Sequence, residues 1–210
     1  FTNRTDSPEL QFRHDMAKAK IHGFLDHPST TFRRYANQNN LPARYARSIA
    51  FYKNGETQKA VELVDKLITT QPNNPYFHEL KGQILYEAGK LKKSIAPYRK
   101  SVALAPDEPL LQIGLATSLL SLENKSSAEE ALGILKKALR IEEDNMTAFY
   151  QMATAYALLG DTGRAELATA ERYYILGNIK KASMHAHRAM KYLPKNSPEW
   201  LKAQDIMANL

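Results

Sequence analysis

The stretch of this chain that comes nearest to a catalytic motif is His78-Glu79-Leu80-Lys81-Gly82. In zinc peptidases, two histidines four residues apart on one helix face bind the metal, and the glutamate after the first histidine activates a water molecule. Here Gly82 stands where the second histidine would be. A single histidine ligand does not make a zinc site, so this stretch predicts no catalytic centre.

The other residues with suitable chemistry do not form a recognisable site either. His185 and His187 are two residues apart, which places their rings roughly 200° apart around a helix and separates them as metal ligands. We find no glycine-rich phosphate loop, nucleophile elbow or paired-carboxylate motif. The chain has no cysteine, which excludes disulfides and thiolate catalysis and leaves the redox compartment open. We therefore predict no catalytic residue, metal ligand or cofactor in this chain.

The elements that would position any binding residue follow a repeat of 34 residues. Pro72 and Pro106 lie 34 residues apart and bracket two helical segments that are joined at Gly89. Helix-turn-helix units of this length are typical of tetratricopeptide repeats (TPRs). With Pro75 as position 1, Gly82 falls at position 8 and Gly89 at position 15, where this repeat has a small residue and a turn residue.

Neighbouring windows keep this register. Small residues recur at positions 8 and 20 of units that start at Leu41, Pro109 and Met146; these residues are Ser48, Ala60, Ala116, Ala131, Ala153 and Ala165. The third unit fits only if the turn at 123–127 is three residues longer than usual. After Gly160 the register is ambiguous, because a unit that starts at Gly163 fits as well.

We predict from this register an all-α tetratricopeptide-repeat (TPR) superhelical solenoid of antiparallel helix pairs. Residues 1–40 are expected to form N-terminal capping helices or a degenerate repeat, and residues 41–210 the TPR solenoid, with a C-terminal capping helix from Pro198 to about Ala208. Two helices should precede Leu41, one beginning at Ser7-Pro8 and one at Pro28. The alternative is a plain helical bundle, in which a sustained 34-residue register would be unexpected.

The formal net charge is +7, and one segment of the last third is locally basic. No carboxylate interrupts the sequence between Arg172 and Lys195, so the helix around Lys180 to Lys195 is locally basic. Its basic residues are Lys180, Lys181, Arg188, Lys191 and Lys195, together with His185 and His187. Such a face could approach an acidic protein, nucleic acid or an anionic membrane. A solvated helix face explains it more simply, because no base-stacking platform accompanies it, and we predict no nucleic-acid partner. No apolar run reaches the roughly 20 residues of a transmembrane segment.

Five segments carry a resemblance to a known family: SPELQFRHDMAKAKIHGFLDHP, LPARYARSIAFYKNGE, QPNNPYFHELKGQILYEAGK, ATAERYYILGN and SPEWLKAQDI. They resemble the C-terminal TPR region of bacterial periplasmic BepA-type zinc metalloproteases, which act in outer-membrane protein quality control. The resemblance implies a periplasmic protein whose zinc-binding metalloendopeptidase domain, with an HExxH motif, lies N-terminal to Phe1. This chain would then be an excised, non-catalytic part that binds that protease domain and presents substrates. An independent TPR adaptor of another complex is the alternative.

The resemblance to TPR domains also implies a peptide-binding groove. In such domains, positions 2, 5, 9, 12 and 13 of the first helices point into the concave surface. The corresponding groove residues here are Tyr45, Ile49, Tyr52, Lys53, Tyr76, Glu79, Gln83, Tyr86, Glu87, Ile113 and Tyr150. Tyrosine combines a large contact area with a polar tip, which suits an extended polypeptide with varied side chains. The alternative for each tyrosine is that its ring merely packs against a neighbouring helix.

Overall fold

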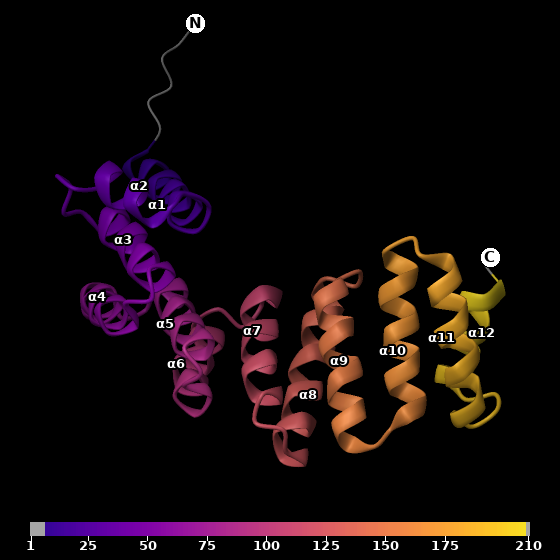
Figure 1. Cartoon of the computed structure of the whole chain (residues 1–210). Coiled ribbons are helices and arrows are strands. Elements are labelled where there is room, and N and C mark those ends of the chain that lie inside the picture. The colour runs from indigo at the N-terminus through magenta and orange to yellow at the C-terminus, as the bar shows by residue number, and fades with distance from the viewer. Residues whose placement is uncertain (1–6, 209–210) are drawn as a thin grey trace, which may run out of the picture. The chain divides into compact units, whose positions relative to one another are not determined.

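A computed structural model describes residues 7–208, which form twelve α-helices and no strand (Figure 1). The chain divides into two compact units, Phe1–Leu104 and Ala105–Leu210, and each unit is described by itself. The helices of the first unit are α1 (Pro8–Leu25), α2 (Pro28–Arg34), α3 (Leu41–Lys53), α4 (Thr57–Thr70), α5 (Pro75–Glu87) and α6 (Leu91–Leu104). Those of the second unit are α7 (Pro109–Leu120), α8 (Lys125–Ile141), α9 (Met146–Leu159), α10 (Thr162–Ile175), α11 (Ile179–Tyr192) and α12 (Pro198–Ala208).

Several helices begin at a proline that follows a polar cap. The backbone N–H of Leu10 donates to Ser7 Oγ at 3.3 Å at the start of α1, and the N–H of Tyr76 donates to Asn74 Oδ1 at 3.1 Å at the start of α5. Proline suits the first helical turn because its missing N–H would have no partner within the helix there. The predicted starts of α1, α2 and α12 are confirmed.

The turns within the helix pairs carry glycine at repeat position 15. Gly55, Gly89 and Gly160 have φ angles of 79°, 73° and 78°. This left-handed conformation ends a helix and is strained for residues with a Cβ atom. The 34-residue spacing of Gly55 and Gly89 therefore reflects a backbone requirement of the turn. Gly160 follows Gly89 after 71 residues, which is two repeats plus the three additional residues of the third unit.

Small residues lie where the helices of a pair approach closely. Ala60, Ala131 and Ala182, all at position 20, are fully buried. A Cβ atom added at Gly82 would lie 2.7 Å from Cδ2 of Tyr98 on the neighbouring helix α6. The predicted close helix crossing is confirmed at Gly82, and the three alanines are buried, as such crossings require.

The predicted long turn at 123–127 is wrong in one respect. Helix α8 already begins at Lys125 and has 17 residues, whereas α4 and α6 have 14 each. Asn124 caps α8 by accepting a hydrogen bond from the N–H of Ser127 at 3.0 Å. Because this cap starts the helix early, the three additional residues lengthen α8 rather than the turn.

The ambiguous register after Gly160 corresponds to a helix that packs on both sides. Helix α10 contacts α9 and, more extensively, α11. Ala170 and Ala182, which belong to the unit that starts at Gly163, are fully buried, whereas Ala153 and Ala165 are half-buried. The tighter pair is therefore α10 with α11.

The two N-terminal helices do not pair with each other as the later helices do. Helix α1 packs mainly on α3, and Ala19 belongs to the same core cluster as Tyr45 and Ile49. Helix α2 is held at the end of α1, because Thr31 Oγ1 donates to the carbonyl of His22 at 3.0 Å. The division into residues 1–40 and 41–210 remains a prediction, and residues 1–6 lie outside the described part of the chain.

Candidate functional site

Nine of the eleven predicted groove residues lie together on α3 and α5 of the first unit. We call them the α3–α5 face; its members are Tyr45, Ile49, Tyr52, Lys53, Tyr76, Glu79, Gln83, Tyr86 and Glu87. The other two, Ile113 on α7 and Tyr150 on α9, belong to the second unit.

Two members of the α3–α5 face are buried. Ile49 has no exposed surface, and its side chain lies directly against Gly23 of α1. Tyr45 is only 2% exposed, and its ring lies 5.7 Å from that of Phe77, between centroids. Burial raises the pKa of the Tyr45 hydroxyl, and the nearby Glu79 carboxylate raises it further. Ile49 therefore offers no open surface to a ligand while α1 is in place.

Charged groups of the face also contact α1. Lys53 Nζ donates hydrogen bonds to the carbonyl of Phe24 at 2.6 Å and to that of Asp26 at 2.7 Å. Lys20 Nζ of α1 lies 3.4 Å from Glu79 Oε2. These contacts hold the C-terminal half of α1 against the face.

The remaining polar members lie towards the C-terminal end of α5. Gln83 Nε2 donates to Glu87 Oε1 at 2.9 Å. Partial burial raises the pKa of the Glu87 carboxyl. Tyr52 and Tyr86 are half-buried, so each ring packs on one side and keeps some accessible surface.

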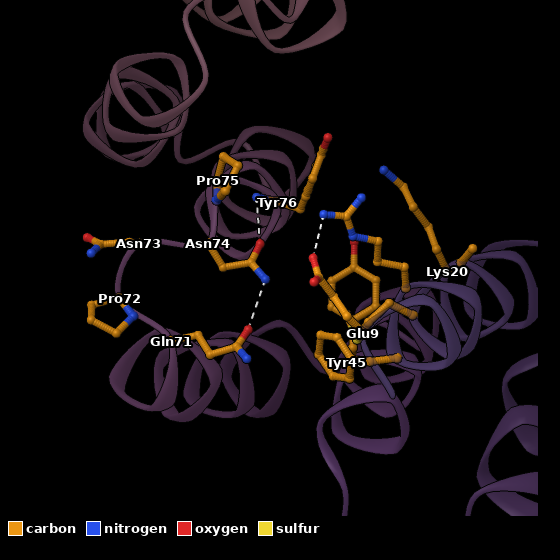
Figure 2. A pocket seen from close by; sticks show the side chains of 13 residues that line it. Glu9, Lys20, Tyr45, Gln71, Pro72, Asn73, Asn74, Pro75 and Tyr76 are labelled. Atoms are coloured by element: carbon orange, nitrogen blue, oxygen red, sulfur yellow. Dashed lines mark hydrogen bonds and ion pairs between the residues drawn. The ribbon is translucent and has the colours of Figure 1, made fainter. Parts of the chain in front are cut away.

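A pocket of about 990 Å³ opens beside this face, between α1 and the start of α5 (Figure 2). It is lined by Glu9, Phe12, Arg13, Met16, Ala17, Lys20, Tyr45, Tyr76 and the loop 71–75. The loop is held by two hydrogen bonds of the Asn74 side chain, one to Gln71 and one from the N–H of Tyr76, each 3.1 Å long. Tyr76 is 44% exposed. An apolar hollow with a few polar groups at its rim is the usual form of a binding pocket.

Sequence reasoning missed the contribution of α1 to this site. The residues involved, including Met16, Lys20 and Gly23, lie outside the 34-residue register that selected the groove residues. Gly23 was the available signal, because glycine within a helix disfavours the helix unless another element approaches closely there.

In the second unit, Tyr150 is 53% exposed, and the guanidinium of Arg172 lies 5.3 Å from its ring centroid. Ile113 is buried. The predicted groove of eleven residues thus comprises positions with very different exposure.

Among residues 7–208, no cluster of three or more histidines, aspartates or glutamates could hold a metal ion. His78 Nε2 contacts the carbonyl of Pro72 at 2.8 Å, and Glu79 pairs with Lys20. His185 Nδ1 lies 2.5 Å from Glu166 Oε2, whereas His187 is exposed. His185 therefore contacts a neighbouring helix while His187 faces solvent, and the two rings lie on different sides of α11, as their spacing predicts.

The basic segment of the last third is helix α11 and the residues after it. Lys180, Lys181, Arg188, Lys191 and Lys195 are all exposed. The described residues include no helix long and apolar enough to cross a membrane.

Comparison with known proteins supports the repeat. Residues 45–109 match the family model described as tetratricopeptide repeat. Among solved structures, YrrB, described as a TPR protein with an unusual peptide-binding site, superposes with a TM-score of 0.62 at 14% identity, over 83% of this chain and 90% of that one. MamA from Desulfovibrio magneticus RS-1 superposes with a TM-score of 0.59 at 15% identity, over 85% of this chain and 92% of that one. The fold is that of a tetratricopeptide-repeat protein.

The predicted fold class, an all-α TPR solenoid of antiparallel helix pairs, is therefore confirmed. A TPR repeat-containing protein of Methanocaldococcus jannaschii, MJ1428, is 26% identical over 174 residues, which cover 78% of this chain and 27% of that protein. The aligned TPR segment is thus about a quarter of that relative.

Proposed function

We propose that this TPR protein is an interaction scaffold that binds a polypeptide at the α3–α5 face. The observation that carries the proposal is the pocket of about 990 Å³ that opens between α1 and α5 within a TPR fold. Its volume is in the range of natural ligand pockets, roughly 300–1,000 Å³. The peptide-binding site described for YrrB, a protein of the same fold, is a second support.

The residues around the pocket favour a polypeptide over a small polar molecule. Phe12, Met16 and Tyr76 supply apolar and aromatic surface, and Tyr76 reaches solvent. Tyr52 on α3 and Tyr86 on α5 are half-buried tyrosines of the same two helices. Tyrosines of this kind contact many different side chains at a small cost in conformational entropy.

Crosslinking to a client polypeptide tests the proposal. A photoreactive unfolded outer-membrane protein segment is mixed with the wild-type chain and with the double variant Tyr52→Ala, Tyr86→Ala. We expect the double variant to crosslink less while its helical circular dichroism melt stays nearly unchanged. Tyr192→Ala, which removes a tyrosine that is 65% exposed in the second unit, serves as the matched control and should crosslink normally. Equal crosslinking by all three proteins, or a collapsed melt of the double variant, would contradict a binding role for the two tyrosines.

The finer proposal is that the chain forms the non-catalytic C-terminal part of a periplasmic BepA-type zinc metalloendopeptidase. Its support is the sequence resemblance of five segments that lie between Ser7 and Ile206 and together comprise 79 of the 210 residues. The zinc and its ligands would belong to the upstream domain, which would also be a binding partner of this chain. Reading the upstream frame tests this directly, because it must encode a signal peptide and an HExxH motif.

An independent TPR adaptor is the second candidate, and the fold supports it equally. It predicts an upstream frame without HExxH. In that case the α3–α5 face would still bind polypeptide, but the partner would be a component of another complex.

A further inference from the structure

The α3–α5 face already holds a helix, because α1 lies on it. Five of its nine residues are engaged with α1 or line the pocket beside it. These residues are Tyr45, Ile49, Lys53, Tyr76 and Glu79. In this position α1 shows what kind of ligand the face accommodates.

The closest contact is steric. A Cβ atom built on Gly23 would lie 2.8 Å from Cδ1 and 2.9 Å from Cβ of Ile49. Ile49 is fully buried and cannot withdraw into free space. The face therefore requires a glycine at this point of the helix that lies on it.

The second contact recognises a helix end. The carbonyls of Phe24 and Asp26 lie at the C-terminus of α1, where carbonyl groups lack partners within the helix. Lys53 Nζ donates to both. A lysine in this place also complements the partial negative charge of the helix C-terminus. An extended chain does not present such a group of converging carbonyls.

The third contact selects a charge. Glu79 pairs with Lys20, whose Nζ also lies 5.9 Å from the ring centroid of Tyr76. Lys20 precedes Gly23 by three residues, so both project from the same side of the helix. The side chain of Lys20 is 46% exposed, which makes the pair a weak, replaceable contact.

We infer that the α3–α5 face recognises a helix with a lysine three residues before a glycine near its C-terminus, and that α1 is its occupant within the chain. This inference rests on the proposed polypeptide binding and specifies its ligand: a partner helix of this chemistry replaces α1. Because α1 is tethered, its effective concentration is on the order of millimolar, so a free helix competes well only when α1 is weakened.

A fluorescent peptide of residues 7–27 tests the inference. It carries His14→Glu joined by a lactam to Lys18, so that it is held helical through side chains that are exposed in α1. Its anisotropy is measured with four full-length proteins: wild type, Lys20→Glu, Gly23→Leu and Lys18→Glu. Lys20→Glu brings a like charge to Glu79, and Gly23→Leu clashes with Ile49, whereas Lys18→Glu makes the same charge change on the exposed side of α1.

We expect Lys20→Glu and Gly23→Leu to bind the peptide about tenfold more tightly than wild type and Lys18→Glu do, because their own α1 competes less. Equal binding by all four proteins would overturn the inference. So would loss of the cooperative melt in both weakened variants, because α1 would then be an integral layer of the unit.

A second peptide separates this inference from the proposed function. It has the same length but carries Ala17→Pro and Ile21→Pro, which prevent a helix. We expect it not to bind the weakened variants. If it binds as tightly as the helical peptide, recognition of a helix is excluded while polypeptide binding stands. If neither peptide nor any client segment binds, both proposals fail.

Discussion

Tyr45 and Tyr150 occupy position 5 of their repeats, yet Tyr45 is 2% exposed and Tyr150 is 53% exposed. Tyr45 lies on α3 and Tyr150 lies on α9. Tyr45 belongs to a core cluster that includes Ala19 of α1 and Phe77 of α5. Tyr150 has Arg172 beside its ring and remains accessible.

This contrast teaches that repeat register fixes the direction of a side chain but not what covers it. The register gives Tyr45 and Tyr150 equivalent places on their own helices. An element from outside the register, α1, then converts the surface of α3 into an interface. The same residue type is therefore part of the core in one repeat and of the surface in another.

The largest test of this contrast is truncation of the two tyrosines. Tyr45→Ala should lower the free energy of unfolding by about 3–5 kcal/mol, as is typical when a buried aromatic side chain is removed. Tyr150→Ala should change it by less than about 1 kcal/mol, since exposed substitutions have small effects. Urea unfolding followed by circular dichroism measures both. Similar losses for the two variants would break the contrast.

Two glycines inside helices allow the same comparison between a covered and an uncovered position: Gly82 is covered by Tyr98, whereas Gly133 has open space around it. Gly82→Leu should destabilise its unit by about 1–3 kcal/mol, because its Cβ atom would lie 2.7 Å from the Tyr98 ring. Gly133→Leu on α8 meets no atom within 4 Å of its Cβ and should be neutral or stabilising, by up to about 1 kcal/mol, through helix propensity. Thermal melts of both variants test this, and a melting temperature of Gly82→Leu equal to that of wild type would show that the register is wrong.

The smallest expected effect concerns a charge contact in the second unit. Arg164 Nη2 lies 3.0 Å from Glu199 Oε1 and links α10 to α12. The backbone N–H of Glu199 and then Arg164 hold the pKa of the Glu199 carboxyl below its ordinary value. A lowered pKa in the folded state stabilises the protein at neutral pH, and this contribution is lost as pH falls below about 4.5.

Glu199→Gln should therefore lower stability at pH 7 by under about 1 kcal/mol, and its difference from wild type should shrink on acidification. Melts at pH 7 and pH 3 provide the comparison. A difference that stays constant or grows at pH 3 would show that the carboxylate charge is not the cause.

Local sequence signals predicted much of the fold. Ser7-Pro8 and Pro198 mark helix starts, and Gly55 and Gly89 mark turns, because caps and left-handed turns depend on residues close in sequence. The longer turn predicted at 123–127 is wrong, because Asn124 caps a helix that already begins at Lys125.

The site was less predictable than the fold. The spacing of the repeats selected residues on α3 and α5, and the structure brings nine of them together. Contacts such as Lys20 with Glu79 join residues 59 positions apart, and no periodicity encodes that pairing. Spacing therefore could not show that α1 would cover Ile49.

Disulfide trapping tests the packing of α1 against α3 most directly. The chain has no cysteine of its own, so only the introduced pair can form a disulfide. In Gly23→Cys with Ile49→Cys, the two Cβ atoms start 2.9 Å apart, and a small shift brings them to the roughly 3.5–4.5 Å of a disulfide. We predict nearly complete intramolecular oxidation, seen as a loss of two hydrogens by mass spectrometry. Lys18→Cys with Ile49→Cys, whose first cysteine lies on the exposed side of α1, should stay reduced. Free thiols in both variants, or equal oxidation of both, would contradict the docking of α1 on the α3–α5 face.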